Sequence, residues 1–148
     1  MLAIRRPPVG SRATEAGDQS AGADEHAGTR ILVVEDDWFA GMDMEASLDQ
    51  AGYDVLGIVM SAEEAIEAAG ENRPDLILMD VRLVGARDGV DAALEIGRRF
   101  AIRCLFVTAF VDPALRARAE PARPIGWLTK PISGASLVAA VRDALARE

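Results

Sequence analysis

The chain has 148 residues, 50% of them hydrophobic, and a formal net charge of −8 at pH 7. A chain of this length has room for one domain with a substantial core and a tail. The acidic balance argues against a nucleic-acid surface, because phosphate binding needs a clustered basic face. No apolar run approaches the roughly 20 residues that cross a bilayer, and the start lacks the apolar core of a signal peptide, so we expect a cytoplasmic protein without membrane contact.

The first 29 residues differ in composition from the rest. They are rich in Gly, Ala, Ser, Asp, Glu and Arg and have almost no aliphatic periodicity, so they cannot offset the entropy of ordering. We therefore predict a disordered tail over residues 1–29 and one folded domain over residues 30–148. The single histidine, His26, falls in this tail, and the single cysteine, Cys104, lies in an apolar run. Any chemistry must then come from carboxylates, hydroxyls and the one lysine.

From residue 30 onward, short apolar runs alternate with stretches of helical periodicity, which is the pattern of repeated strand–helix units. The predicted strands are residues 31–34, 55–60, the run between Pro74 and Asp80, residues 104–107 and residues 125–129. The third run is bounded by a proline and a charge, which is typical of a strand buried on both faces of a parallel sheet.

Each predicted strand is followed by a helix with its own boundary signals. Gly52 ends the first helix, and Ser61 with Glu64 predicts a capping box at the start of the second. The pair Asp88-Gly89 leads into the third helix, and Ser133 opens the fifth.

The fourth helix is expected to be short. It begins at Asp112-Pro113, an N-cap followed by proline at the first helical position. Pro121 and Pro124 end it, because proline cannot donate a hydrogen bond in a helix interior.

Five such units with right-handed crossovers predict an α/β fold, a flavodoxin-like (βα)5 domain with helices on both faces of a five-stranded parallel sheet. The predicted strand order is 2-1-3-4-5, which places strands one and three side by side at the topological switch point. Ligands bind in such folds at the carboxyl ends of the strands.

Five polar residues follow or end these strands: Glu35, Asp36, Asp80, Thr108 and Lys130. The predicted topology gathers them at one edge of the sheet. Converging carboxylates repel one another unless a cation neutralises them, and carboxylate oxygens favour Mg²⁺. The sequence therefore predicts a magnesium site.

Simpler explanations exist for some of these residues. Asp37 can cap the following helix, whose dipole favours an acid in its first turn. Thr108 is also a good strand former. Lys130 is the only lysine among 16 basic residues, which suggests a need for a compact charge that reaches a phosphoryl oxygen, although chance placement is the alternative.

Four segments together resemble the receiver domains of two-component response regulators. They are Val33-Val34-Glu35-Asp36-Asp37, Leu78-Met79-Asp80, Val107-Thr108-Ala109 and Leu128-Thr129-Lys130-Pro131. Each is weak alone, but their order and their positions at strand ends make the combination specific. The resemblance covers residues 30–148.

The resemblance implies that Asp80 accepts a phosphoryl group from a sensor histidine kinase or a phosphotransfer protein. Mg²⁺ would be held by Asp36, Asp80 and the backbone carbonyl of Arg82, with Glu35 acting through water. The protein would assist its own phosphorylation and dephosphorylation rather than act as an enzyme on a separate substrate.

In the family, a hydroxyl residue and a lysine grip the phosphoryl oxygens, and these would be Thr108 and Lys130. The hydroxyl residue is coupled to an aromatic side chain in the fifth strand. Trp127 holds that position, with an ordinary core or surface tryptophan as the alternative.

The chain departs from the family pattern in two places. The loop 83–89 lacks the usual proline and is one residue longer than usual, which leaves its mobility open. In the family, the face made by the fourth helix, the fifth strand and the fifth helix usually forms a homodimer. The short fourth helix weakens that inference here, so a homodimer is one possibility and a monomer the other.

Because the chain ends soon after the fifth helix, we expect a stand-alone single-domain regulator that signals by contact with a downstream protein. A phosphate sink or relay intermediate is the alternative within the family. A haloacid-dehalogenase-type phosphatase is a remote alternative, since Arg82 stands where that family has a second aspartate.

Overall fold

The computed structural model describes residues 28–147. These residues form one parallel sheet of five strands in the order β2-β1-β3-β4-β5, so the predicted flavodoxin-like topology is confirmed. The predicted tail, residues 1–29, and with it His26, lies outside the described residues except for its last two positions.

The elements follow the predicted alternation of strands and helices. The strands are β1 (Arg30–Val34), β2 (Asp54–Val59), β3 (Leu76–Met79), β4 (Cys104–Thr108) and β5 (Gly126–Thr129). The helices are α2 (Trp38–Gln50), α3 (Ala62–Asn72), α4 (Gly89–Phe100), α5 (Pro113–Ala119), the 3₁₀ turn η2 (Glu120–Ala122) and α6 (Gly134–Ala146).

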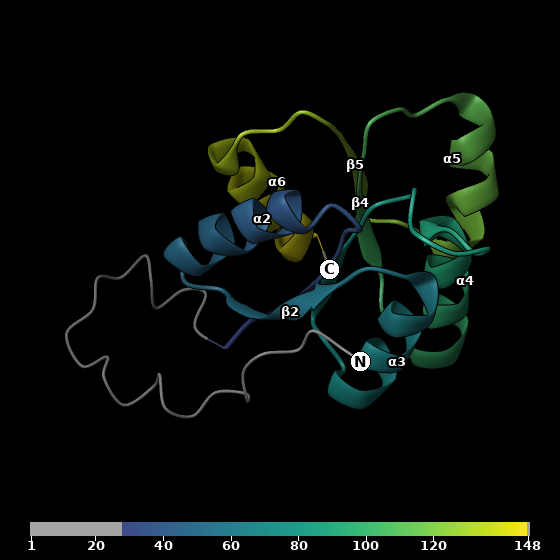
Figure 1. Ribbon diagram of the computed structural model, residues 1–148, viewed down its shortest axis with the longest axis horizontal. Helices are drawn as coiled ribbons and strands as arrows, with labels where there is room; N and C mark the ends of the chain where they lie inside the picture. Colours follow the sequence, from purple (N-terminus) through teal and green to yellow (C-terminus); the bar gives the residue numbers. More distant parts are fainter. Residues whose placement is uncertain (1–27, 148) are drawn as a thin grey trace.

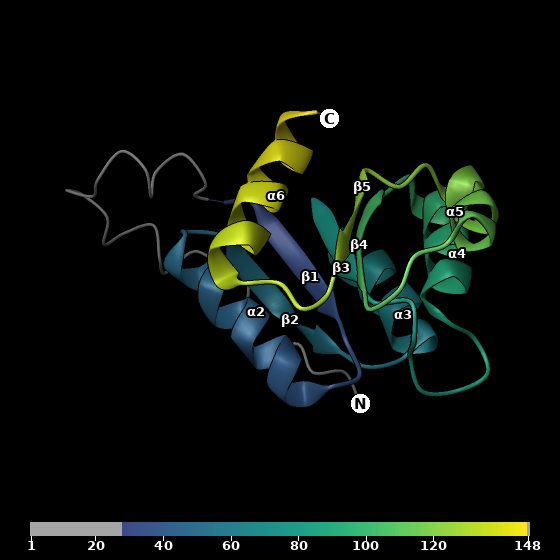
Figure 2. The ribbon, with the colours of Figure 1, turned by 90° about the horizontal axis from the view of Figure 1, so that it is seen from above.

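Helices cover both faces of the sheet. In Figures 1 and 2, α2 and α6 lie on one face, and α3, α4 and α5 lie on the other. Successive residues of β1 point to opposite faces: Leu32 and Val34 pack in the layer with α3 and α4, whereas Ile31 and Val33 pack with α2 and α6. This burial on both sides explains why the strands are continuous apolar runs.

Side-chain caps begin the helices as predicted, with one correction. The Ser61 hydroxyl accepts a hydrogen bond from the Glu64 amide at 3.1 Å. The Glu64 carboxylate, however, accepts from the Met60 amide at 2.9 Å. The predicted capping box at Ser61 is therefore only half formed, because the glutamate reaches one residue further back along the chain.

Several predicted boundaries also shift by a residue or two, including both ends of β2, which spans Asp54–Val59. The fourth helix is short as expected and ends at Ala119. Pro121 does not end the helical segment, because it lies inside the 3₁₀ turn that follows. The tighter turn accommodates proline near its first positions. The fifth strand begins at Gly126 and not at Ile125.

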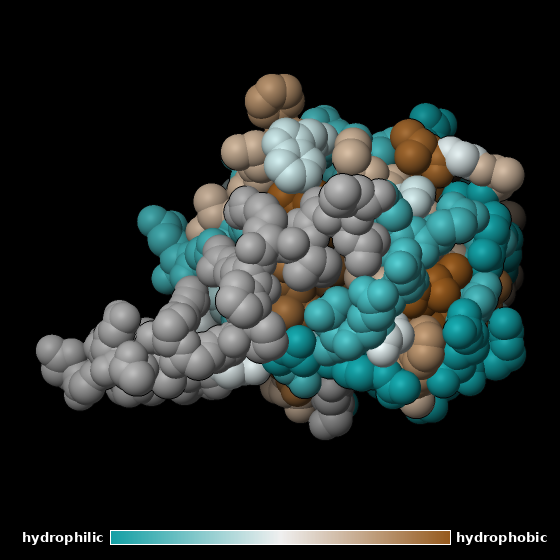
Figure 3. Space-filling view, turned by 60° about the horizontal axis from the view of Figure 1, so that its bottom comes forward, coloured by the Kyte–Doolittle hydropathy of each residue, from teal (hydrophilic) through white to brown (hydrophobic). Residues whose placement is uncertain are grey.

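The described surface is mainly hydrophilic on the face shown in Figure 3, where hydrophobic areas are separate rather than continuous. Within residues 28–147, no helix combines the length and the apolar character that a membrane-spanning helix requires.

Candidate functional site

The carboxyl ends of β1 and β3 bring the acidic residues together. The two strands are neighbours, with Val34 paired in register to Met79, so Glu35 and Asp80 each follow a residue of the same pair. The Asp80 amide donates to the Val34 carbonyl at 3.0 Å. Main-chain hydrogen bonding thus holds Asp80 at the switch point of the sheet, where ligands bind in this fold.

The carboxylates of Glu35, Asp36 and Asp80 form a compact cluster, with one oxygen from each lying within 4.8 Å of the others. Glu35 is 1% exposed and Asp80 is 6% exposed. Asp37 lies outside this cluster and caps α2 by accepting from the amides of Phe39 and Ala40. Helix capping therefore explains Asp37, whereas Asp36 is part of the acidic cluster.

Lys130 supplies the positive charge that this cluster needs. Its Nζ donates to Glu35 Oε1 at 2.6 Å and to Asp80 Oδ2 at 3.0 Å. Its own amide donates to the Thr108 carbonyl at 2.8 Å, which anchors the lysine to the end of β4. The one lysine of the sequence thus reaches from the end of β5 to the carboxylates that follow β1 and β3.

Burial and ion pairing act against each other in this group. Burial by itself lowers the pKa of Lys130, but the hydrogen bonds to Glu35 and Asp80 outweigh it and raise that pKa, so the ammonium stays charged. Burial raises the pKa of Glu35, although the hydrogen bonds from Lys130 and the Asp37 amide oppose this rise. The site therefore favours a further cation beside its carboxylates.

The backbone just after Asp80 contacts the carboxylate oxygen that Lys130 does not. The Arg82 amide donates to Asp80 Oδ1 at 3.3 Å, while the Arg82 side chain is exposed. The Gly89 amide donates to the Val81 carbonyl at 2.7 Å, which closes the loop between them. Val84, within this proline-free loop, forms an isolated bridge to Ser61, so the loop is tied to the start of α3.

Thr108 and Trp127 take the places that the sequence predicts for them. Thr108 is the last residue of β4 and is 4% exposed. Trp127 lies in β5 with its ring stacked on Phe106, the centroids 4.5 Å apart. Trp127 therefore packs in the core layer of α3 and α4, and its role as a switch stays a prediction.

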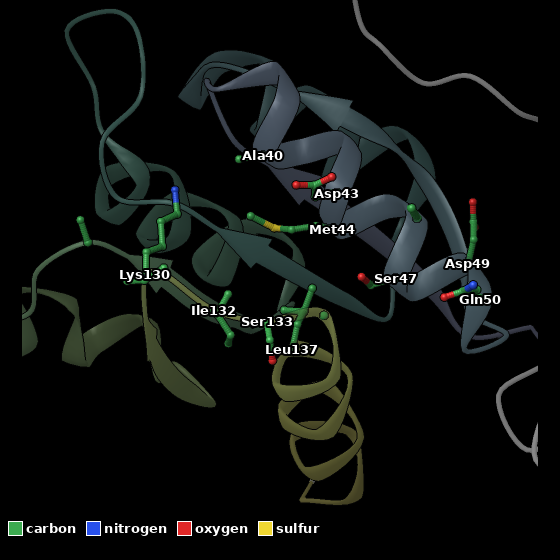
Figure 4. A pocket seen from close by; sticks show the side chains of 14 residues that line it. Ala40, Asp43, Met44, Ser47, Asp49, Gln50, Lys130, Ile132, Ser133 and Leu137 are labelled. Carbon is green, nitrogen blue, oxygen red and sulfur yellow. The ribbon is translucent and has the colours of Figure 1, made fainter.

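Sequence reasoning missed an open groove between α2 and the start of α6, with a volume of about 1240 Å³. Figure 4 shows Lys130 at one end of this groove, Asp49 and Gln50 at the other, and Met44 and Leu137 between the helices. Periodicity places Met44 on an inner helix face, but it does not tell how closely two helices approach.

Fold and site together define a doubly wound α/β domain with an aspartate–lysine centre at the carboxyl edge of its sheet. Residues 31–142 match the response regulator receiver domain, and the chain belongs to this family of two-component signalling proteins. Receiver domains are generally signalling modules rather than enzymes, and they generally bind Mg²⁺ at an acidic site.

Two curated relatives are similar over most of the chain. The transcriptional regulatory protein PdtaR of Mycobacterium tuberculosis is 36% identical over 125 residues, 84% of this chain and 60% of the relative. The phyllosphere-induced regulator PhyR of Methylorubrum extorquens is 36% identical over 118 residues, 79% of this chain and 43% of the relative. The chain thus spans about half the length of these relatives.

Solved structures support the same assignment. The signal receiver domain of a modulated diguanylate cyclase from Desulfovibrio desulfuricans G20 is 34% identical, with a TM-score of 0.73 and coverage of 80% of this chain and 94% of that one. The N-terminal domain of a response regulator/sensory box/GGDEF protein from Carboxydothermus hydrogenoformans is 33% identical, with the same TM-score and the same coverage of both chains.

Proposed function

We propose that this protein receives a phosphoryl group on Asp80 and signals through contact with another protein. One observation supports this most: a buried aspartate at the switch point has one oxygen 3.0 Å from a lysine ammonium and lies beside two further carboxylates. This arrangement leaves a carboxylate as nucleophile with positive charge next to it, which is what stabilises phosphoryl transfer.

The donor would be a phosphohistidine on a sensor histidine kinase or a phosphotransfer protein. An Asp80 oxygen forms a bond to phosphorus as the nitrogen–phosphorus bond breaks, and the donor histidine leaves as the imidazole. Lys130 then shifts its hydrogen bonds toward the new phosphoryl oxygens, and the Thr108 hydroxyl donates to another.

The acidic cluster fits Mg²⁺, because it offers hard oxygen donors whose mutual repulsion a divalent cation relieves. Asp36 and Asp80 would hold the ion, together with the Arg82 carbonyl, and Glu35 would act through water. When bound, the ion neutralises charge on the transferring phosphoryl group.

The step after phosphorylation is expected to be binding of a downstream protein. The curated relatives extend well beyond the matched region, so the downstream protein is not inferred from them. A cytoplasmic location is likewise proposed.

The test is the intact mass of the protein after incubation with Mg²⁺ and acetyl phosphate. The wild type should gain one phosphoryl group, and Asp80→Asn should gain none. Asp143→Asn, the same chemical change on the exposed face of α6, should behave as the wild type does. The proposal fails if the wild type gains no mass or if Asp80→Asn gains it equally.

A further inference from the structure

Helix α5 buries unusually little of its surface. Only Ala119 is buried among its seven residues, whereas α2, α3, α4 and α6 each bury at least three. Figures 1 and 2 show α5 at the edge of the molecule beside α4. Apolar burial therefore contributes less to holding α5 than to holding the other helices.

Arg118 joins α5 to the start of α4. Its guanidinium donates to Asp88 at 2.6 Å and lies 3.4 Å from Asp91, the two carboxylates that form the capping box of α4. Burial by itself raises the pKa of Asp88, but the hydrogen bonds from Arg118 and the α4 backbone outweigh it and lower that pKa. The carboxylate is thus charged at neutral pH, as the ion pair requires.

Arg116 joins the same helix to β5. Its guanidinium lies over the Trp127 ring, 5.3 Å from the centroid, and the Trp127 ring stacks on Phe106 of β4. A cation over an indole face is attracted by the electrons of the ring. Arg116 and Arg118 therefore attach α5 to two different elements through charge.

We propose that these two arginines are an electrostatic latch that holds α5, and that α5 opens locally when their charge is screened or removed. The helix follows Thr108 after only a short connection, so the latch also limits how far that connection moves. This device belongs to the fold itself and does not depend on phosphorylation of Asp80.

Hydrogen–deuterium exchange tests the latch. Local opening of a helix sets the exchange rate of its amides. We expect exchange in residues 113–119 to be roughly twofold to fivefold faster in Arg116→Ala and in Arg118→Ala than in the wild type at low salt. Raising NaCl from 0.01 to 1 M shortens the screening length from about 30 to about 3 Å. This should accelerate exchange of α5 in the wild type but hardly in a double variant that carries both Arg116→Ala and Arg118→Ala.

Arg142→Ala is the matched control, because it removes an exposed arginine from α6. It should leave exchange in α5 unchanged, and exchange in α3 should stay unchanged in all variants. Arg118→Lys keeps the charge and should fall between the wild type and Arg118→Ala. Equal exchange of α5 in all variants, a uniform acceleration of every helix, or a lysine variant that behaves as alanine would each overturn the proposal.

Discussion

At the scale of single residues, Lys130 is placed between two buried carboxylates. Glu35, Asp36 and Asp80 lie close together, and two of them are almost completely buried. The Lys130 ammonium contacts both buried carboxylates. In the absence of another cation, this one charge offsets their mutual repulsion, so Lys130 and the proposed Mg²⁺ would compete to neutralise the same cluster of carboxylates.

This competition predicts the effect of Lys130→Gln. Without Mg²⁺, the free energy of unfolding should fall by roughly 2–3 kcal/mol, less than the roughly 3–5 kcal/mol for breaking a fully buried pair, because the Lys130 side chain is 25% exposed. Adding Mg²⁺ should raise the melting temperature of the variant more than that of the wild type, since a ligand stabilises the state that binds it more tightly. Thermal unfolding with and without Mg²⁺ measures both effects.

Arg142→Gln changes the net charge equally at an exposed position on α6. It should respond to Mg²⁺ as the wild type does. Equal stabilisation of all three proteins by Mg²⁺ would contradict the competition between lysine and metal.

At the scale of elements, the start of α4 is packed directly against the backbone of Asp80. A Cβ atom on Gly89 would lie 1.9 Å from the Asp80 carbonyl oxygen and 3.0 Å from the Met79 side chain. The sequence pair Asp88-Gly89 thus has two separate functions: the aspartate caps the helix, and the glycine allows the helix to approach the backbone of Asp80.

Gly89→Ala should therefore be strongly destabilising. The added methyl group meets backbone that cannot move without displacing Asp80, so we expect a loss of roughly 3 kcal/mol or more. Gly97→Ala is the same change in the same helix, but its Cβ would meet only Ala122, at 3.9 Å. It should stabilise the protein by about 0.5–1 kcal/mol through helix propensity. Urea denaturation measures the free energy of unfolding of both variants. A Gly89→Ala variant as stable as the wild type would show that the backbone of Asp80 leaves room for a methyl group.

At the scale of the whole molecule, one sheet supports two core layers. Leu48 of α2 belongs to one layer and Ile96 of α4 to the other, and both are 0% exposed. Because β1 and β3 contribute side chains to both layers, neither layer can lose its packing without exposing the sheet. The two layers should therefore unfold together.

Leu48→Ala and Ile96→Ala test this coupling. Each should lower the free energy of unfolding by about 2–5 kcal/mol, the usual cost of a large-to-small change in a core. Each should also keep a single transition in which circular dichroism and tryptophan fluorescence coincide. Separate transitions in either variant would show that the layers are independent.

Much of the fold could be predicted from the sequence, because its signals are local. Strand–helix alternation, the proline-bounded strand before Asp80 and the caps at Asp112 and Ser133 all depend on residues close along the chain. The errors were also local: a glutamate that reached one residue further than a capping box requires, and a proline that a 3₁₀ turn accommodated.

The polar residues that gather at the carboxyl edge of the sheet can be predicted from the order of the strands along the chain, because a parallel sheet aligns the ends of its strands. Which atoms meet at that edge, and which ion pairs form elsewhere, depends on the three-dimensional packing. Lys130 pairs with Glu35 across 95 positions of the chain, and Arg118 pairs with Asp88 across 30. Such pairs depend on helix packing and side-chain rotamers, and these leave no periodic pattern in the sequence.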